Sequence, residues 1–154
     1  MEIERKFTIK HLPEELDNYE SAEIEQGYLC RAPVVRVRRY GEEYILTYKN
    51  RVAAGEGSPI VNIEEEFPLT KEAYEHLRGK ADGNIISKRR YRIPLYDGLV
   101  AELDVFHGKF EGLVFAEVEF RDVEQSMAFI KPDWFDEDVT DDYHYSNGYM
   151  SSVK

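Results

Sequence analysis

The chain has 154 residues, enough for one domain with a hydrophobic core that needs no disulfide or structural metal. Its formal net charge of −11 argues against nucleic acid or an acidic membrane surface as a partner. The single cysteine excludes an internal disulfide framework and a thiolate metal site, and no apolar run reaches the roughly 20 residues of a membrane-spanning helix. The start of the sequence shows no secretory signal, so we expect a single cytoplasmic domain over residues 1–154.

A period of two, typical of β-strands, runs through most of the sequence. The Gly-containing stretch 53–59 is expected to form a flexible loop. Asp97-Gly98 favours a tight hairpin turn, because Gly tolerates the positive φ that a type I′ turn demands. Eight strands are predicted, at residues 2–10, 23–30, 34–40, 43–50, 60–68, 84–95, 99–106 and 113–121.

Helices are few and short in the predicted structure. One is expected at 70–79 with Thr70 as its N-cap, one turn of helix at 13–17, and another after Asp122. The acidic, Tyr-rich tail 133–154 is interpreted mostly as loop, pinned to the strands by its apolar start. The sequence therefore predicts a mainly β protein of the α+β class.

Like charges recur at positions i and i+2, which a strand places on one face. Adjacent like charges repel on a sheet, so an ordinary solvent-facing surface mixes the two signs. Any single pair is compatible with a solvated face, but the repetition on strand after strand indicates a binding surface. The acidic pairs are Glu2/Glu4, Glu64/Glu66, Glu102/Asp104 and Glu117/Glu119, and the basic pairs are Arg36/Arg38 and Lys88/Arg90, with Lys6 and Lys49 in phase on their strands.

This combination of charges suits a metal–triphosphate complex. Arg can bind phosphate oxygens with two hydrogen bonds, and Lys meets them as a point charge. Mg²⁺ prefers carboxylate oxygens and commonly bridges them to substrate phosphates. A closed sheet of eight strands can enclose one small ligand. We therefore predict an eight-stranded antiparallel β-barrel that forms a tunnel, with a few short helices outside.

Read in order, the charged motifs resemble the CYTH superfamily, the triphosphate tunnel metalloenzymes, over nearly the whole chain. The hallmark of that superfamily is Glu-x-Glu-x-Lys at the start, and here it covers residues 2–6. The remaining landmarks lie at 35–38, 46–49, 63–67, 87–91, 102–106 and 117–120, and the segments 138–140 and 145–147 resemble the end of its bacterial branch.

The resemblance implies a role for each charged residue. The metal, Mg²⁺ or Mn²⁺, is expected on Glu2, Glu4, Glu117 and Glu119. Triphosphate is expected on Lys6, Arg36, Arg38, Lys49, Lys88 and Arg90, while Arg92, near a strand end, is left out. The other acids are expected to orient these basic side chains, hold a second metal or position the attacking water; they are Glu64, Glu66, Glu102 and Asp104. Of the whole set, Lys6, Arg38, Lys88 and Glu66 are expected to act in catalysis.

The expected activity is metal-dependent hydrolysis of inorganic tripolyphosphate by a monomer or homodimer. Alternatives within the superfamily are thiamine triphosphatase and class IV adenylyl cyclase, and a further alternative is a non-catalytic module that binds polyphosphate or nucleotide. Of the remaining candidates, Cys30 is interpreted as a small buried residue. The histidines are interpreted as surface residues, with His144 as a possible cover over a tunnel mouth.

Overall fold

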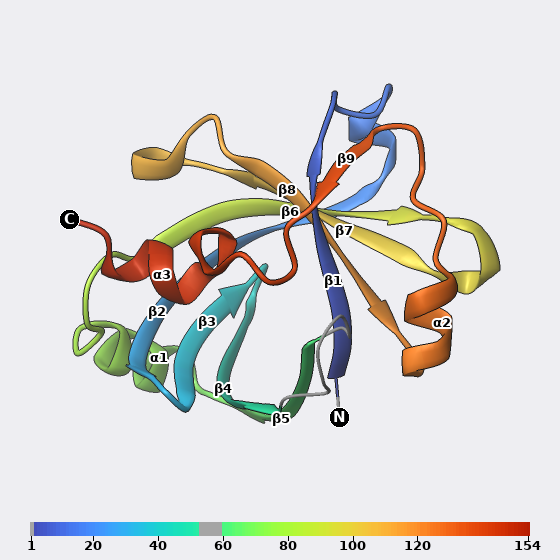
Figure 1. The fold of residues 1–154 in the computed structure, drawn as a ribbon. Coiled ribbons are helices and arrows are strands. Elements are labelled where there is room, and N and C mark those ends of the chain that lie inside the picture. The colour runs from blue at the N-terminus through green and yellow to red at the C-terminus, as the bar shows by residue number, and fades with distance from the viewer. Residues whose placement is uncertain (1, 53–59) are drawn as a thin grey trace.

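The computed structural model describes residues 2–52 and 60–154, with the backbone alone at 51, 52 and 60–62. The loop expected at 53–59 lies outside the described residues. The described residues form nine strands and three short α-helices (Figure 1). The strands are β1 (Glu2–Ile9), β2 (Glu20–Arg31), β3 (Val34–Tyr40), β4 (Glu43–Val52), β5 (Ile60–Pro68), β6 (Ile86–Pro94), β7 (Val100–Phe106), β8 (Val114–Phe120) and β9 (Phe135–Asp138), and the helices are α1 (Lys71–Arg78), α2 (Val123–Ala128) and α3 (Asn147–Ser152).

The strands form one antiparallel sheet in the order β5-β4-β3-β2-β6-β7-β8-β1-β9. β1 also pairs with β5, through Glu2, Ile3 and Glu4, so eight strands surround a tunnel. Farther along, the same edge of β1 pairs with β9, from Phe7 to Ile9. The predicted eight-stranded tunnel is thus confirmed in its architecture, with a ninth strand added outside the ring.

The main hydrophobic core lies outside the tunnel. Alternation along β1 places Ile3 and Phe7 in this core, while Glu2, Glu4 and Lys6 face inward. The outer faces of β7 and β8 contribute to the same core, which Phe135 of β9 and Phe129 after α2 cover. The inner face is therefore free to carry charge.

A second apolar cluster closes the inner face at one end. Ile86, Phe106 and Phe115 continue the inward-facing rows of β6, β7 and β8, and Met150 of α3 packs against them. These four residues are buried. The C-terminal helix is therefore anchored beside the tunnel, against β2 and β6 (Figure 1).

Several local predictions are confirmed. Thr70 caps α1 by accepting a hydrogen bond from the Ala73 amide at 3.1 Å, and Asp122 caps α2 in the same way. Asp97 and Gly98 both have positive φ, 57° and 72°, as the predicted turn requires. No helix among the described residues is both long and apolar enough to cross a membrane.

Three local predictions are wrong. At 13–17 the chain forms only a 3₁₀ turn, Leu16–Asn18, because the left-handed conformation of Glu15 (φ 54°) prevents an earlier start. The tail interpreted as loop contains β9 and α3, both too short to show a period in the sequence. Cys30 is exposed, because it lies at an irregularity in the β2–β3 pairing, and it belongs to neither apolar cluster.

Candidate active site

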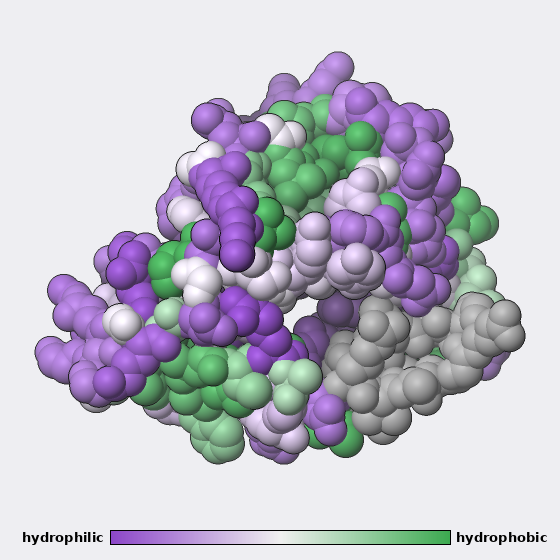
Figure 2. All heavy atoms as spheres, turned by 60° about the vertical axis from the view of Figure 1, so that its left-hand side comes forward, coloured by the Kyte–Doolittle hydropathy of each residue, from purple (hydrophilic) through white to green (hydrophobic). Residues whose placement is uncertain are grey.

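The tunnel contains a cavity of about 880 Å³, and Figure 2 shows the molecule hollowed at its centre. Each strand from β1 to β8 supplies charged side chains to its wall, and the segment 140–152 contributes to one side. All the predicted site residues line this cavity except Glu66 and Asp104, each of which contacts a lining residue. The cavity brings together Glu2, Glu4, Lys6, Arg36, Arg38, Lys49, Glu64, Lys88, Arg90, Glu102, Glu117 and Glu119.

The acidic part of the cavity lies where β1 and β8 pair. Glu4 stands opposite Glu119 in the ladder and shares a hydrogen bond with Glu117. Burial, and then the charge of Glu117, raises the pKa of Glu4 well above its usual value. Burial also raises the pKa of Glu117, but Lys6 and the other nearby bases outweigh it and hold that pKa low. Of this pair, Glu4 is therefore the more readily protonated.

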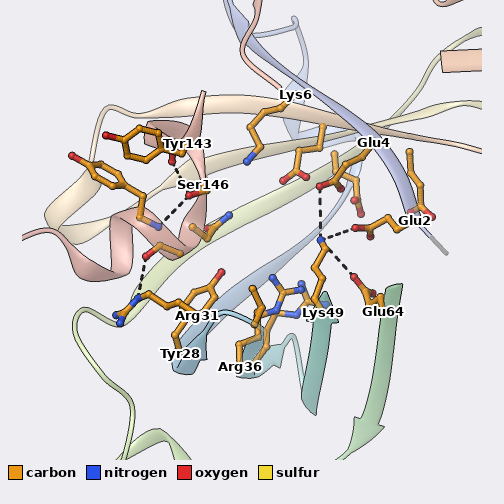
Figure 3. A pocket seen from close by; sticks show the side chains of 18 of the residues that line it. Glu2, Glu4, Lys6, Tyr28, Arg31, Arg36, Lys49, Glu64, Tyr143 and Ser146 are labelled. Carbon is orange, nitrogen blue, oxygen red and sulfur yellow. Dashed lines mark hydrogen bonds and ion pairs between the residues drawn. The ribbon is translucent and has the colours of Figure 1, made fainter. Parts of the chain in front are cut away.

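Lys49 of β4 reaches into this acidic part (Figure 3). Its Nζ lies 2.6 Å from Glu2 Oε1, 3.6 Å from Glu64 Oε2 and 3.8 Å from Glu4 Oε1. Burial lowers the pKa of Lys49, but Glu4 and Glu2 outweigh that effect and raise it above its usual value. Among the described residues, no three Asp, Glu, His or Cys side chains are arranged to hold a metal ion. In this structure the Lys49 ammonium lies among these carboxylates.

The basic part of the cavity contains guanidinium groups with unused donors. The Nε atoms of Arg36 and Arg38 are buried and form no hydrogen bond within the described part of the chain. Burial, then the charges of Arg36 and Arg90, lowers the pKa of Arg38 to about 10. The acidic contact of Arg38 is a long one, 3.4 Å to Glu66 Oε2. Uncompensated positive charge with free donors is the property of an anion site.

Asp104 lies beneath this basic part and holds two of its members. It is fully buried, accepts two hydrogen bonds from Arg90 at 2.8 and 2.9 Å, and forms an ion pair with Lys88 Nζ at 2.7 Å. Burial lowers the pKa of Lys88 to about 8 even though Asp104 favours its charged form. The pKa of Asp104 itself is depressed, because Arg90 and Lys88 outweigh its burial. Its geometry is that of an acid that orients bases, one of the roles expected for it.

Two other predicted acids lie near the margins of the site. Glu66 is half-exposed and accepts hydrogen bonds from Arg38 and from Thr47 Oγ1. Glu102 is shared between Arg90, at 3.7 Å, and Arg92, at 2.7 Å. Arg92 lines the cavity although it was left out of the predicted set. Its common phase with Lys88 and Arg90 was the signal for it.

The C-terminal segment contributes contacts that the sequence did not reveal. Lys6 Nζ donates to the Tyr145 carbonyl oxygen at 2.7 Å, and Lys88 Nζ lies 3.2 Å from Asn147 Oδ1. Tyr143 lines the cavity nearby, as Figure 3 shows. His144 stacks on Tyr143 with ring centroids 4.1 Å apart, and it is exposed at the surface. The tail therefore borders the site.

Tyr28 and Arg31 of β2 are further cavity residues that went unpredicted. Tyr28 hydrogen-bonds to Arg36, and Arg31 donates to the Gly148 carbonyl and to Ser151 Oγ of α3. A tyrosine in an alternating strand is indistinguishable by pattern from a core residue. Only the strand register reveals its place beside Arg36.

Comparison with known proteins finds relatives that are similar to this chain over nearly its whole length. No protein-family model matches the chain. An inorganic triphosphatase of Nitrosomonas europaea is 36% identical over 149 residues, which cover 95% of this chain and 93% of that protein. An inorganic triphosphatase of Acetivibrio thermocellus is 35% identical over 153 residues, covering 95% and 90%.

Solved structures agree with this relationship. The crystal structure of an inorganic triphosphatase matches with a TM-score of 0.72 at 33% identity, over 100% of this chain and 96% of that one. A protein from Hippeastrum with a dominant triphosphatase activity shares the fold at a TM-score of 0.64 and 18% identity, over 82% and 83% of the two chains. Since two relatives exceed a third identity along nearly their whole length, this chain belongs to the inorganic triphosphatase family.

Proposed function

We propose that this protein hydrolyses inorganic tripolyphosphate to phosphate and pyrophosphate with a divalent metal, Mg²⁺ or Mn²⁺, inside the tunnel. The observation that carries the proposal is the coexistence, in one cavity, of guanidinium groups with unused donors and a concentrated set of carboxylates. The relatives named inorganic triphosphatase support the same activity. On this basis we also place the chain in the CYTH superfamily.

The basic residues bind the phosphate chain. Arg36 and Arg38 of β3 and Arg90 of β6 offer guanidinium donors, and Lys6 of β1 and Lys88 of β6 offer ammonium groups. Their spread over strands that face one another fits a row of phosphates better than a single one. Binding by Arg38 becomes stronger as charge moves onto the phosphate oxygens in the transition state, so this residue contributes to turnover as well as affinity.

The carboxylates fit a hard divalent cation. Glu2, Glu4, Glu117 and Glu119 supply oxygen ligands only, which is the donor type that Mg²⁺ and Mn²⁺ prefer. Burial and neighbouring carboxylates raise the pKa values of Glu4 and Glu119, which supports a cation site among these side chains. When bound there, the metal neutralises phosphate charge and orients the chain for attack.

The reaction itself is an in-line displacement. Water attacks the terminal phosphorus, the bond to the bridging oxygen breaks, and pyrophosphate leaves. Lys88, with a pKa of about 8, can bind phosphate and can also exchange a proton near neutral pH. Glu66 touches Arg38 from outside the cavity, so we assign it to the positioning of Arg38.

A phosphate-release panel tests the proposal. Tripolyphosphate, pyrophosphate, ATP and thiamine triphosphate are compared with Mg²⁺, with Mn²⁺ and with excess chelator. Tripolyphosphate is expected to be cleaved fastest, and only with metal. Preference for thiamine triphosphate or formation of cyclic AMP from ATP would assign the tunnel to one of the other activities. Tight metal-dependent binding without turnover would make the protein a binding module.

A further inference from the structure

Lys49 is enclosed by acids that are expected to bind the metal. Its ammonium contacts Glu2 at 2.6 Å and also lies within 4 Å of Glu4 and Glu64. All four side chains are mostly buried, with exposed fractions between 15% and 21%. Figure 3 shows these contacts converging on the ammonium from β1 and β5.

One ammonium cannot balance this set of carboxylates. Glu2, Glu4 and Glu64 surround it, and Glu119 stands opposite Glu4 in the ladder between β1 and β8 and lines the same cavity. A divalent ion offers twice the charge and binds carboxylate oxygens directly. An ammonium and a divalent ion, both in contact with Glu2, would repel each other strongly in such a poorly solvated place. The two cations therefore exclude each other.

The Lys49 ammonium can also reach the basic part of the cavity. Its strand neighbour on the same face, Thr47, pairs in register with Arg36, and the charge of Arg36 acts on Lys49. The flexible four-carbon stem can swing the ammonium from the acids toward the arginine side. The other two cavity lysines are held differently, Lys6 by the Tyr145 carbonyl and Lys88 by Asp104.

We propose that Lys49 is an exchangeable internal cation, which holds the carboxylates together in the metal-free protein and moves onto triphosphate when the metal takes its place. This inference rests on the proposed function. Metal binding then delivers one more positive charge to the phosphates, and phosphate binding withdraws the competitor of the metal. By thermodynamic linkage, each ligand raises the affinity for the other by the same factor.

Mn²⁺ binding to the metal-free protein, measured by calorimetry without any phosphate, tests the proposal. Lys49→Gln removes the competitor, so its Mn²⁺ dissociation constant is expected to fall at least tenfold. Lys49→Arg retains a cation and is expected to bind no more tightly than the wild type. Lys71→Gln, at an exposed site in α1, makes the same change in net charge and is expected to stay within twofold.

A methylene-bridged triphosphate that cannot be cleaved tests the second half. In the wild type it is expected to tighten Mn²⁺ binding, and in Lys49→Gln by a clearly smaller factor. Equal or weaker Mn²⁺ binding by Lys49→Gln would overturn the proposal while leaving the proposed function intact, as long as the wild type cleaves tripolyphosphate. A wild type that binds no Mn²⁺ would overturn both.

A measurement on the wild type alone covers the case in which Lys49→Gln fails to fold. In a crystal structure with Mn²⁺ and the uncleavable analogue, Lys49 Nζ is expected to have left Glu2 and to lie within hydrogen-bond distance of a phosphate oxygen. If Nζ remains bonded to Glu2 in that complex, the exchange does not occur.

Discussion

Asp104→Asn removes the only negative charge from a buried trio, Asp104, Lys88 and Arg90. Asp104 is fully buried, and its two oxygens accept from Arg90 at 2.8 and 2.9 Å and from Lys88 at 2.7 Å. An amide oxygen can still accept one of these bonds, but Lys88 then loses its carboxylate partner, and Arg90 keeps only longer contacts, 3.7 Å to Glu102 and 3.9 Å to Glu117. Removing one partner of a buried ion pair costs about 3–5 kcal/mol.

For a chain of this length, such a loss corresponds to a fall in melting temperature of roughly 6 °C or more. Melting and urea unfolding at pH 7, without metal or phosphate, measure it. Tripolyphosphate is expected to recover part of the loss, because its negative charge substitutes for that of Asp104. The variant should therefore show a larger ligand-induced rise in melting temperature than the wild type.

Glu102→Gln is the matched control. It makes the same chemical change on the same face of β7, but Glu102 is partly exposed and contacts Arg90 only at 3.7 Å. Its loss is expected to stay below about 1 kcal/mol. If Asp104→Asn is no more harmful than Glu102→Gln, then Asp104 is not the counter-ion that supports the basic part of the site.

Three more outcomes follow from the same geometry. Arg38→Ala is expected to lower kcat/KM for tripolyphosphate roughly a hundredfold, with partial recovery in Arg38→Lys, and steady-state kinetics giving wild-type values would remove Arg38 from the site. Glu4→Gln is expected to lose most turnover and most of the rise in melting temperature that Mn²⁺ causes. The stability of the metal-free protein should not fall, because the substitution removes repulsion with Glu117. An unchanged melting shift would show that Glu4 is not a metal ligand. Lys88→Met is expected to raise the free energy of unfolding by about 3 kcal/mol at pH 7. The gain should disappear between pH 8 and about 10.5, because the folded protein releases the Lys88 proton near pH 8 and the unfolded chain holds it up to the ordinary pKa of lysine. A gain that does not change with pH in urea titrations would contradict this.

The inward-facing charges could be predicted because a strand has a strict period of two. Glu4 and Lys6 are two residues apart on one strand, so they stay on the same face whatever the register with the neighbouring strands, and the same holds for Lys88 and Arg90. The period of two does not say whether an inward-facing charged side chain lines the cavity or is covered by another side chain. That depends on the side chains of the neighbouring strand. Asp104 is covered by Arg90, its ladder partner, and Glu66 extends beyond the wall, so neither lines the cavity.

The tail could not be predicted because its structure comes from distant contacts. α3 has only six residues. Hydrogen bonds from Arg31 and Asn84, which are 117 and 66 residues away from their partners, hold it in place, and its own Met150 packs against a distant apolar cluster. Isolated helices of that length are unstable in water. Ser146 caps α3 and Asn147 meets Lys88, and nothing in the sequence indicated either contact.

Placing the hydrophobic core outside the ring has a consequence for the chemistry inside. The apolar faces of β1, β7 and β8 gain their stability from β9 and from the segment after α2, so the inner faces need not pack against each other. Charges can then line an enclosed space, where each acts more strongly than at an open surface. Without ligands some of these charges form internal pairs, as Lys49 does with Glu2 at 2.6 Å and Arg38 does with Glu66 at 3.4 Å. A metal–triphosphate complex carries positive and negative charge, so it can replace the internal pairs of the acidic part and those of the basic part at once. The metal alone neutralises only the acidic part and the phosphate alone only the basic part, and the other part then keeps its internal pairs.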